Sequence, residues 1–156
     1  MLEKGQLVVW EPLTNNPFSR FDNPMNLVNM HYEGDFILVF EEFNGSKEYT
    51  FTYGKNKSNL NSVITFRILD EIARADIEKL ISRVGKERVT QGLSKLTYEP
   101  TFYKVKNSSY LSWYDGINPI LFDIHPSVEH HLYITSEFMI DVLSEQEPFI
   151  TISTNK

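Results

Sequence analysis

The sequence predicts an α+β protein, with a mainly antiparallel sheet of about six to eight strands and two or three helices packed on one face. Several short segments alternate large apolar or aromatic side chains with other residues, which is typical of strands. Residues 72–84 instead repeat apolar side chains at helical spacing. The 156 residues contain no internal repeat and no obvious linker, so we expect a single globular domain over residues 1–156.

The clearest strand pattern covers residues 36–53, and we expect the rest of the fold to be organised around it. Two alternating runs flank Asn44-Gly45, the dipeptide most typical of a tight type I′ turn, because both of its residues tolerate a positive φ. The runs therefore predict a β-hairpin with large side chains on one face: Phe36, Leu38, Phe40, Tyr49, Phe51 and Tyr53. We expect the helix at 72–84 and the segment around Trp113 to cover this face.

Alternation predicts further strands elsewhere in the chain. They cover residues 7–10, 26–32, 63–69, 101–106 and 130–135, with a closing strand around Ile150 and Ile152. Residues 12–24 hold three prolines and form a loop, and the polar residues 54–62 form an exposed loop. The pattern over 136–143 fits a strand and a helix equally well.

The main helix is predicted to begin after Asp70, whose carboxylate suits an N-cap. Its apolar stripe follows helical spacing: Ala73, Ile77, Leu80, Ile81 and Val84. We expect Gly85 to end this helix, and residues 86–96 to form a second one. Asn107 or Ser108 can cap a short helix that begins at residue 109.

Composition limits the protein's environment and chemistry. The absence of cysteine excludes disulfides, thiol nucleophiles and cysteine metal sites. The apolar run near the N-terminus is too short for a signal peptide or a membrane span, so we expect a cytoplasmic protein without a membrane partner.

Charge is distributed unevenly along the chain. The net charge is −6, and residues 107–155 contain seven acidic residues but no lysine or arginine. An acidic third disfavours nucleic acid, whose phosphates need clustered basic side chains. It suits a basic protein partner, which complementary charge would attract. The alternative is an acidic surface that serves solubility alone.

No catalytic or metal-binding motif is found in the sequence. The four histidines, His31, His125, His130 and His131, lack the spacing of a metal site, and His130 and His131 should point to opposite sides of a strand. We expect a strand histidine to bond a backbone carbonyl instead. Nucleophilic-serine and phosphate-binding patterns are also missing. The sequence therefore predicts no catalytic residues, no metal and no cofactor.

Aromatic side chains gather between residues 102 and 114: Phe102, Tyr103, Tyr110, Trp113 and Tyr114. Such a cluster forms either a binding surface with tyrosine and tryptophan anchors or an aromatic core between helix and sheet. We favour the core for most of the cluster and keep Trp113 and Tyr114 as candidate anchors.

Two segments carry a family resemblance. Residues 102–113 follow the pattern F-x-K-V-x-N-S-x-Y-L-x-W, and His131, Ile140-Asp141-Val142 and Glu147-Pro148 follow downstream. With the Phe66–Glu71 junction, residues 63–152 resemble small uncharacterised cytosolic proteins of Gram-positive bacteria. The resemblance implies an α+β fold without an assigned catalytic site, and a strand over 138–143. The C-terminal part is also similar to immunity proteins paired with polymorphic bacterial toxins, which implies a binding partner.

Three hypotheses about function follow. The first is a non-enzymatic protein that binds another protein, such as an immunity protein neutralising a basic toxin domain. Its candidate partner-binding residues are Trp113, Tyr114, Asp115, Asp123, Glu129, Glu137, Asp141, Glu145 and Glu147. The second is a small-molecule binder or enzyme with a pocket that pairs His125, His130 or His131 with carboxylates. The third is a structural homodimer subunit with an exposed apolar sheet face.

Overall fold

The computed structural model describes residues 1–43, 45–54 and 62–154. Within these residues, nine strands form two antiparallel sheets, accompanied by three α-helices and one short 3-10 helix. The predicted α+β class is confirmed. The number of strands exceeds the expected six to eight. The strands are also divided between two sheets, because a sequence pattern can mark a strand without showing which sheet it joins.

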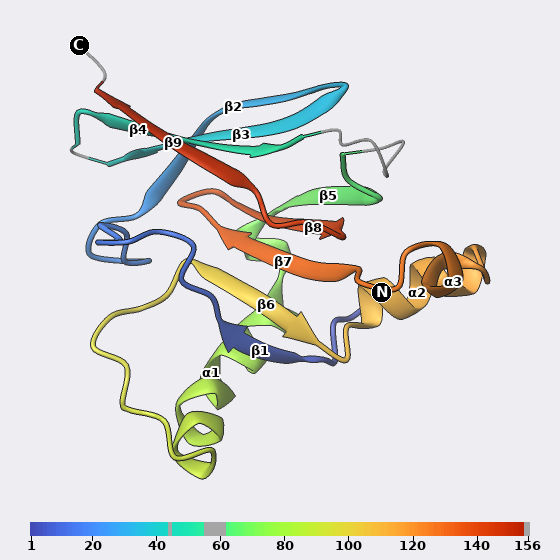
Figure 1. Ribbon diagram of the computed structural model, residues 1–156. Coiled ribbons are helices and arrows are strands. Elements are labelled where there is room, and N and C mark those ends of the chain that lie inside the picture. The colour runs from blue at the N-terminus through green and yellow to red at the C-terminus, as the bar shows by residue number, and fades with distance from the viewer. Residues whose placement is uncertain (44, 55–61, 155–156) are drawn as a thin grey trace.

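The five-stranded sheet has the order β1-β6-β7-β8-β5. Its strands are β1 (Gln6–Val9), β6 (Phe102–Lys106), β7 (Glu129–Ile134), β8 (Phe138–Ser144) and β5 (Thr65–Asp70). The four-stranded sheet has the order β2-β3-β4-β9. Its strands are β2 (Met25–Glu33), β3 (Asp35–Glu42), β4 (Lys47–Tyr53) and β9 (Phe149–Thr154). The two sheets lie one against the other, and the residues expected as a strand over 138–143 form most of β8 (Figure 1).

The predicted hairpin is present as β3 and β4. Its register pairs Phe36 with Tyr53, Leu38 with Phe51, and Phe40 with Tyr49, so all six side chains share one face and are buried. Strand β3 ends at Glu42 and β4 begins at Lys47, and the type I′ turn stays a prediction. Asn44 itself lies outside the described residues.

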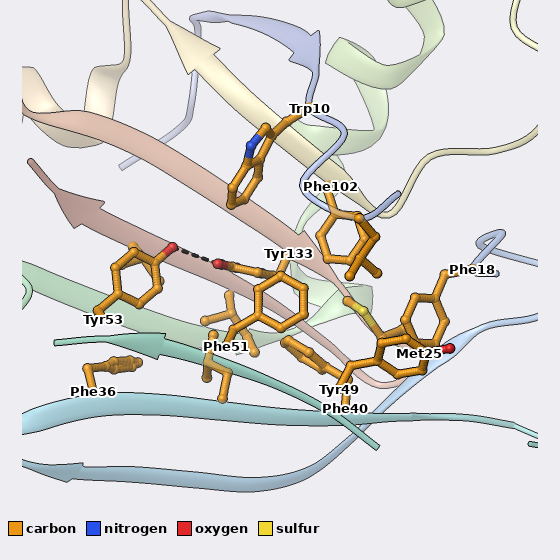
Figure 2. Packing of buried hydrophobic residues seen from close by; sticks show 14 of the residues in the cluster. Trp10, Phe18, Met25, Phe36, Phe40, Tyr49, Phe51, Tyr53, Phe102 and Tyr133 are labelled. Carbon is orange, nitrogen blue, oxygen red and sulfur yellow. Dashed lines mark hydrogen bonds between the residues drawn. The ribbon is translucent and has the colours of Figure 1, made fainter. Parts of the chain in front are cut away.

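The buried face of this hairpin packs against the five-stranded sheet, and the prediction that helices cover it is wrong. The ring of Phe51 lies 5.5 Å from the ring of Phe102 and 5.6 Å from that of Tyr133, both on the opposite sheet. The Phe40 ring also stacks on Tyr133, at 5.5 Å (Figure 2). A sheet offers a wide, complementary apolar face, and one helical stripe is too narrow to cover six aromatic and aliphatic side chains.

Helix α1 (Ala75–Thr90) covers the other face of the five-stranded sheet. Ile77, Leu80 and Val84 are buried against a cluster that includes Leu7 and Leu132. The molecule therefore has three layers in this region: a sheet, a second sheet and a helix (Figure 1).

The predicted ends of the main helix are wrong at both sides. The Asp70 carboxylate accepts a hydrogen bond from the Ile72 amide at 3.0 Å, but it caps the 3-10 helix Glu71–Ala73, and α1 begins two residues later. Gly85 lies inside α1, because one glycine costs only about 1 kcal/mol relative to alanine. The helix stops just before Gly92, whose φ of +73° suits a left-handed C-terminal position. The predicted second helix is thus partly the end of α1.

Two shorter helices connect β6 with β7: α2 (Ser109–Ile117) and α3 (Leu121–Ile124). The predicted N-cap is confirmed, since Ser108 Oγ accepts a hydrogen bond from the Leu111 amide at 3.0 Å. Both helices lie beyond the ends of β6 and β7 (Figure 1). Tyr110 is buried, but Trp113 remains 48% exposed, so only part of the aromatic cluster belongs to the core.

Candidate functional site

A chain of short hydrogen bonds connects the start of α2 to the five-stranded sheet. Ser108 Oγ lies 2.6 Å from His130 Nδ1, and His130 Nε2 lies 2.6 Å from Asp141 Oδ1. All three side chains are buried. Because an ionised carboxylate can only accept, Nε2 of His130 carries a proton. When the imidazole is neutral, its Nδ1 accepts from the Ser108 hydroxyl. We call Ser108, His130 and Asp141 the relay.

Strand register explains why these residues meet. His130 on β7 pairs with Leu143 on β8, and Asp141 lies two residues before Leu143. Side chains two residues apart on a strand point to the same face, so His130 and Asp141 are diagonal neighbours. This face is the one that α1 and α2 cover, and Ser108 reaches it from the turn after β6.

Two arginines hold the Asp141 carboxylate. Asp141 Oδ2 accepts from Arg67 Nε at 2.7 Å and from Arg74 Nη1 at 2.6 Å. Burial by itself would raise the pKa of Asp141, but the hydrogen bond from His130 and the charges of Arg74 and Arg67 outweigh it and hold the pKa well below its ordinary value. Asp141 is therefore a buried anion with a complete set of partners.

Glu3 occupies the amides at the start of α2. Its carboxylate accepts from the Ser109 amide at 2.7 Å and from the Tyr110 amide at 3.0 Å, and the Glu3 amide donates to Asp76 Oδ2 at 2.8 Å. A carboxylate at a helix N-terminus satisfies free amides and is favoured by the helix dipole. Glu3 therefore ties the N-terminal segment to both α1 and α2.

His131 faces the opposite side of the sheet, as predicted. Its Nδ1 lies 2.7 Å from the Tyr53 hydroxyl, its Nε2 lies 3.2 Å from Glu129, and its ring stacks on Trp10 at 4.6 Å. Burial lowers the pKa of His131, and the hydrogen bond to Glu129 opposes that effect only in part. Both strand histidines bond side chains, so the expected bond to a backbone carbonyl is wrong.

A pocket of about 480 Å³ lies beside the relay. Ser108 and His130 line it, together with an apolar wall formed by Val8, Val105, Leu111, Phe122 and Val128. Lys106 and Asn107 also line the pocket, and Asn107 has a left-handed backbone with φ +53°. A histidine–carboxylate pair beside a pocket is the feature that the second sequence hypothesis required.

The two short helices expose large apolar side chains that no described part of the chain covers. We define the α2–α3 surface by these residues, which are between 46% and 61% exposed: Trp113, Ile117, Ile120, Phe122 and Ile124. Isolated exposed apolar residues are normal, but five within twelve consecutive positions are typical of an interaction site. Asp115 and Asp123 lie on the same two helices.

The predicted acidic face is only partly assembled. Asp141 is fully buried, so its place on a solvent-facing acidic surface is wrong. The alternation of β8 does not show that α1 covers this face of the strand, nor that Arg74 binds Asp141 there. Glu137 lies in the turn after β7, at the opposite end of the β7–β8 pair from the two short helices. Trp113, Tyr114 and Asp115 lie on α2, and Asp123 lies on α3.

The remaining predicted carboxylates have partners within the protein. Glu129 and Glu147 bind Lys104 Nζ at 3.2 and 2.6 Å, and Glu145 binds His125. A hydrogen bond from His131, together with Lys104, lowers the pKa of Glu129 to about 2. A basic partner would therefore meet mainly the exposed Asp123 and the half-buried Asp115 on these two helices.

The relay was missed by sequence reasoning. Ser108 was identified only as a helix cap, His130 only as a strand residue, and Asp141 as a surface acid. The spacing of these three residues has no local pattern, because strand register and the turn before α2 bring them together. One signal in the sequence could have indicated the relay. Asp141 has apolar residues on both sides, which is typical of a buried strand position.

Among the described residues, no group of three histidine, aspartate or glutamate side chains is placed to hold a metal ion. Within the same part of the chain, none of the helices is long and apolar enough to cross a bilayer. The fold defines the class as an α+β protein with two stacked antiparallel sheets. No protein-family model, curated protein or solved structure matches the chain. The resemblance to the Gram-positive proteins stays a prediction.

Acid is expected to destabilise this protein through Asp141 and Glu129. Both carboxyl groups have a lowered pKa when folded, so the unfolded chain takes up their protons first as the pH falls. Their contribution is complete above the ordinary carboxyl pKa of about 4 and is lost progressively toward pH 2. Urea unfolding at pH 7, 5, 4 and 3 should show a falling midpoint.

Glu129→Gln provides the matched test of that prediction. Because this variant lacks one lowered carboxyl pKa, its midpoint should fall less between pH 5 and pH 3 than that of the wild type. Asp123→Asn, an exposed carboxylate on α3, should retain the wild-type slope. An identical slope for Glu129→Gln and the wild type would contradict the assignment.

Proposed function

We propose that this chain is a cytoplasmic protein-binding protein, and that its α2–α3 surface docks a basic protein domain. The observation that carries the proposal is the exposed apolar patch on a segment without lysine or arginine. An immunity protein that neutralises a basic toxin domain is the form of this function that fits the resemblance noted in the sequence.

The composition of the surface supports a protein partner. Interface centres are enriched in aromatic side chains and surrounded by polar residues, and tryptophan is a frequent energetic hot spot. Trp113 lies on the surface and stacks on the buried Tyr110 ring at 6.0 Å, so its orientation is set by the core. A side chain held in one orientation loses less entropy on binding.

Charge supports a basic partner. Asp123 is exposed on α3, Asp115 is half-buried on α2, and no lysine or arginine lies on either helix. Charged residues at the edge of an interface mainly raise the association rate and make it sensitive to salt. We therefore assign attachment to the apolar side chains and long-range attraction to the carboxylates.

The hypothesis of a homodimer through an apolar sheet face has less support. The register places Ile37 and Val39 on the outward side of the four-stranded sheet, next to Asn29, Thr50 and Thr52. This side is mixed, whereas the α2–α3 surface is contiguous along the chain and apolar.

The test is co-expression with the proteins encoded by the adjacent genes, followed by calorimetry with the purified pair. We expect the wild type to bind a basic neighbour and to rescue growth if that neighbour is toxic. Trp113→Ala should weaken binding by about 30-fold or more, since a hot-spot truncation costs about 2 kcal/mol. Asp115→Asn with Asp123→Asn should slow association and reduce its salt dependence.

Phe149→Ala is the matched control, because it removes an exposed aromatic side chain from β9 on the other sheet. It should leave affinity unchanged. Equal losses for Trp113→Ala and Phe149→Ala, or no binding to any neighbouring product, would contradict the proposal.

A further inference from the structure

We propose that Ser108 is an activated nucleophile that takes the acyl group of a small apolar ester bound in the adjoining pocket. This proposal does not rest on partner binding, although Phe122 belongs both to the pocket and to the α2–α3 surface. The inference starts from the placement of the relay, whose serine and histidine both line the pocket of about 480 Å³.

The relay has the hydrogen-bond polarity that nucleophilic serine chemistry requires. With a neutral imidazole, the Ser108 hydroxyl donates to His130 Nδ1 at 2.6 Å, and His130 Nε2–H donates to Asp141 Oδ1 at 2.6 Å. In this arrangement the imidazole takes the serine proton and the carboxylate stabilises the resulting imidazolium. Here the serine bonds Nδ1 and the carboxylate bonds Nε2, whereas in the serine proteases the serine bonds Nε2 and the aspartate bonds Nδ1. Either ring nitrogen can act as the base.

Asp141 is held firmly in this role. Arg67 and Arg74 bind its second oxygen at 2.7 and 2.6 Å, so the oxygen that faces His130 keeps a fixed position. A group whose own partners lock its rotamer orients the imidazole without movement during the reaction. Arg67 and Arg74 therefore serve as positioning residues.

The backbone around Ser108 also favours a negative charge on its oxygen. The Leu111 amide donates to Ser108 Oγ at 3.0 Å, at the positive end of the α2 dipole. The preceding residue, Asn107, has a φ of +53°, a conformation that costs energy in a residue other than glycine and recurs where side chains must be aimed.

The pocket selects the class of substrate. Its volume lies within the usual range for small-molecule sites. One part of its wall is apolar, formed by four aliphatic side chains and Phe122, and the rest is polar and includes Lys104 and Glu129. The apolar part suits a short apolar acyl group. Lys106 and Asn107 line the same pocket and can donate hydrogen bonds to a carbonyl oxygen.

The step balances without a cofactor. Ser108 Oγ attacks the ester carbonyl carbon while its proton passes to His130 Nδ1. The bond to the alcohol oxygen then breaks, and His130 returns that proton to the departing alkoxide. The products are an acyl-Ser108 ester and an alcohol. Water, deprotonated by His130, later releases the carboxylic acid and restores Ser108.

Turnover should be slow, for a reason visible in the structure. Glu3 occupies the amides of Ser109 and Tyr110, which would otherwise lie near a developing oxyanion. Loss of one oxyanion donor lowers the rate by about 10²–10³-fold in a serine protease. The expected signature is therefore one stable acyl group per chain.

The test is to incubate the full chain with p-nitrophenyl acetate, and separately with a fluorophosphonate, and to follow intact mass and peptide masses. We expect a single adduct on Ser108. Ser108→Gly should abolish it while keeping α2 capped, since glycine at an N-cap costs only a few tenths of a kcal/mol relative to serine. Ser82→Ala, which removes an exposed serine on α1 that does not line the pocket, should label at the wild-type rate.

His130→Gln should slow labelling by about 10²-fold or more, as expected on loss of a general base. Circular dichroism confirms that each variant is folded before its rate is compared. Absence of an adduct on Ser108 in the folded wild type would overturn the proposal. So would labelling of Ser108→Gly at the wild-type extent, or wild-type labelling by a folded His130→Gln.

Discussion

Replacing Asp141 by alanine is expected to lower the free energy of unfolding by about 3–5 kcal/mol, because it leaves buried charge without its partner. Asp141 is fully buried and is the shared acceptor for Arg67, Arg74 and His130. Arg74 is 2% exposed, so it cannot recover hydration when the carboxylate is removed. Urea denaturation followed by tryptophan fluorescence measures the change.

The control for that variant is Asp123→Ala, which removes an exposed carboxylate from α3. Its free energy of unfolding should change by less than about 0.5 kcal/mol, as for most surface substitutions. A loss below about 1 kcal/mol for Asp141→Ala would mean that water reaches Arg74, and it would contradict the description of Asp141 as the buried partner of that arginine.

Replacing Phe51 by alanine is expected to lower the free energy of unfolding by about 3–5 kcal/mol, the usual range for a buried phenylalanine. Phe51 is fully buried and contacts Phe40 on its own sheet and Phe102 and Tyr133 on the other. The loss combines the transfer energy of the ring with a cavity between two sheets that cannot close without moving strands. Thermal and urea unfolding should both report it.

Phe149→Ala is the matched control for Phe51→Ala, because it makes the same chemical change on the neighbouring strand β9, where Phe149 is 71% exposed. Its effect should stay within about 0.5 kcal/mol. A loss at Phe51 no larger than the loss at Phe149 would show that the two sheets are not held together by this aromatic core.

The relay and the α2–α3 surface meet at α2. Ser108 caps that helix, Glu3 binds its first amides, and Trp113 extends from it toward solvent. The buried polar cluster therefore also positions the surface that we propose as the docking site. Asp141→Ala should weaken partner binding through displacement of α2, although Asp141 lies too deep to touch a partner.

Local patterns in the sequence were sufficient wherever neighbours along the chain decide the structure. Alternation identified β3 and β4 and the face that carries Phe36, Phe40 and Phe51, because side chains on a strand alternate by geometry alone. Ser108 was identified as a cap for a similar reason, since its hydroxyl bonds an amide three residues away. Gly85 was wrongly predicted to end the helix. The packing of Leu80 and Val84 stabilises α1 by more than the free energy that one glycine costs in a helix.

The candidate site was predicted less well, since distant residues create it. Trp113, Asp115 and Asp123 were expected on one surface; the first two belong to α2 and the third to α3, and their role in binding stays a prediction. Asp141 was expected on that surface as well, because a charged side chain is usually exposed to solvent. Its burial depends on Arg67 and Arg74, which are 74 and 67 residues away in sequence.

The amino-acid sequence by itself determined the α+β class, the hairpin with one apolar face, and the acidic residues 107–155 that contain no lysine or arginine. These properties belong to single segments and to composition. Only the tertiary structure decided which surface covers the hairpin, that Asp141 is an interior anion, and that Ser108 meets His130 beside a pocket. The physical reason is that burial and hydrogen bonding depend on strand order and register, which bring together side chains that no local spacing connects.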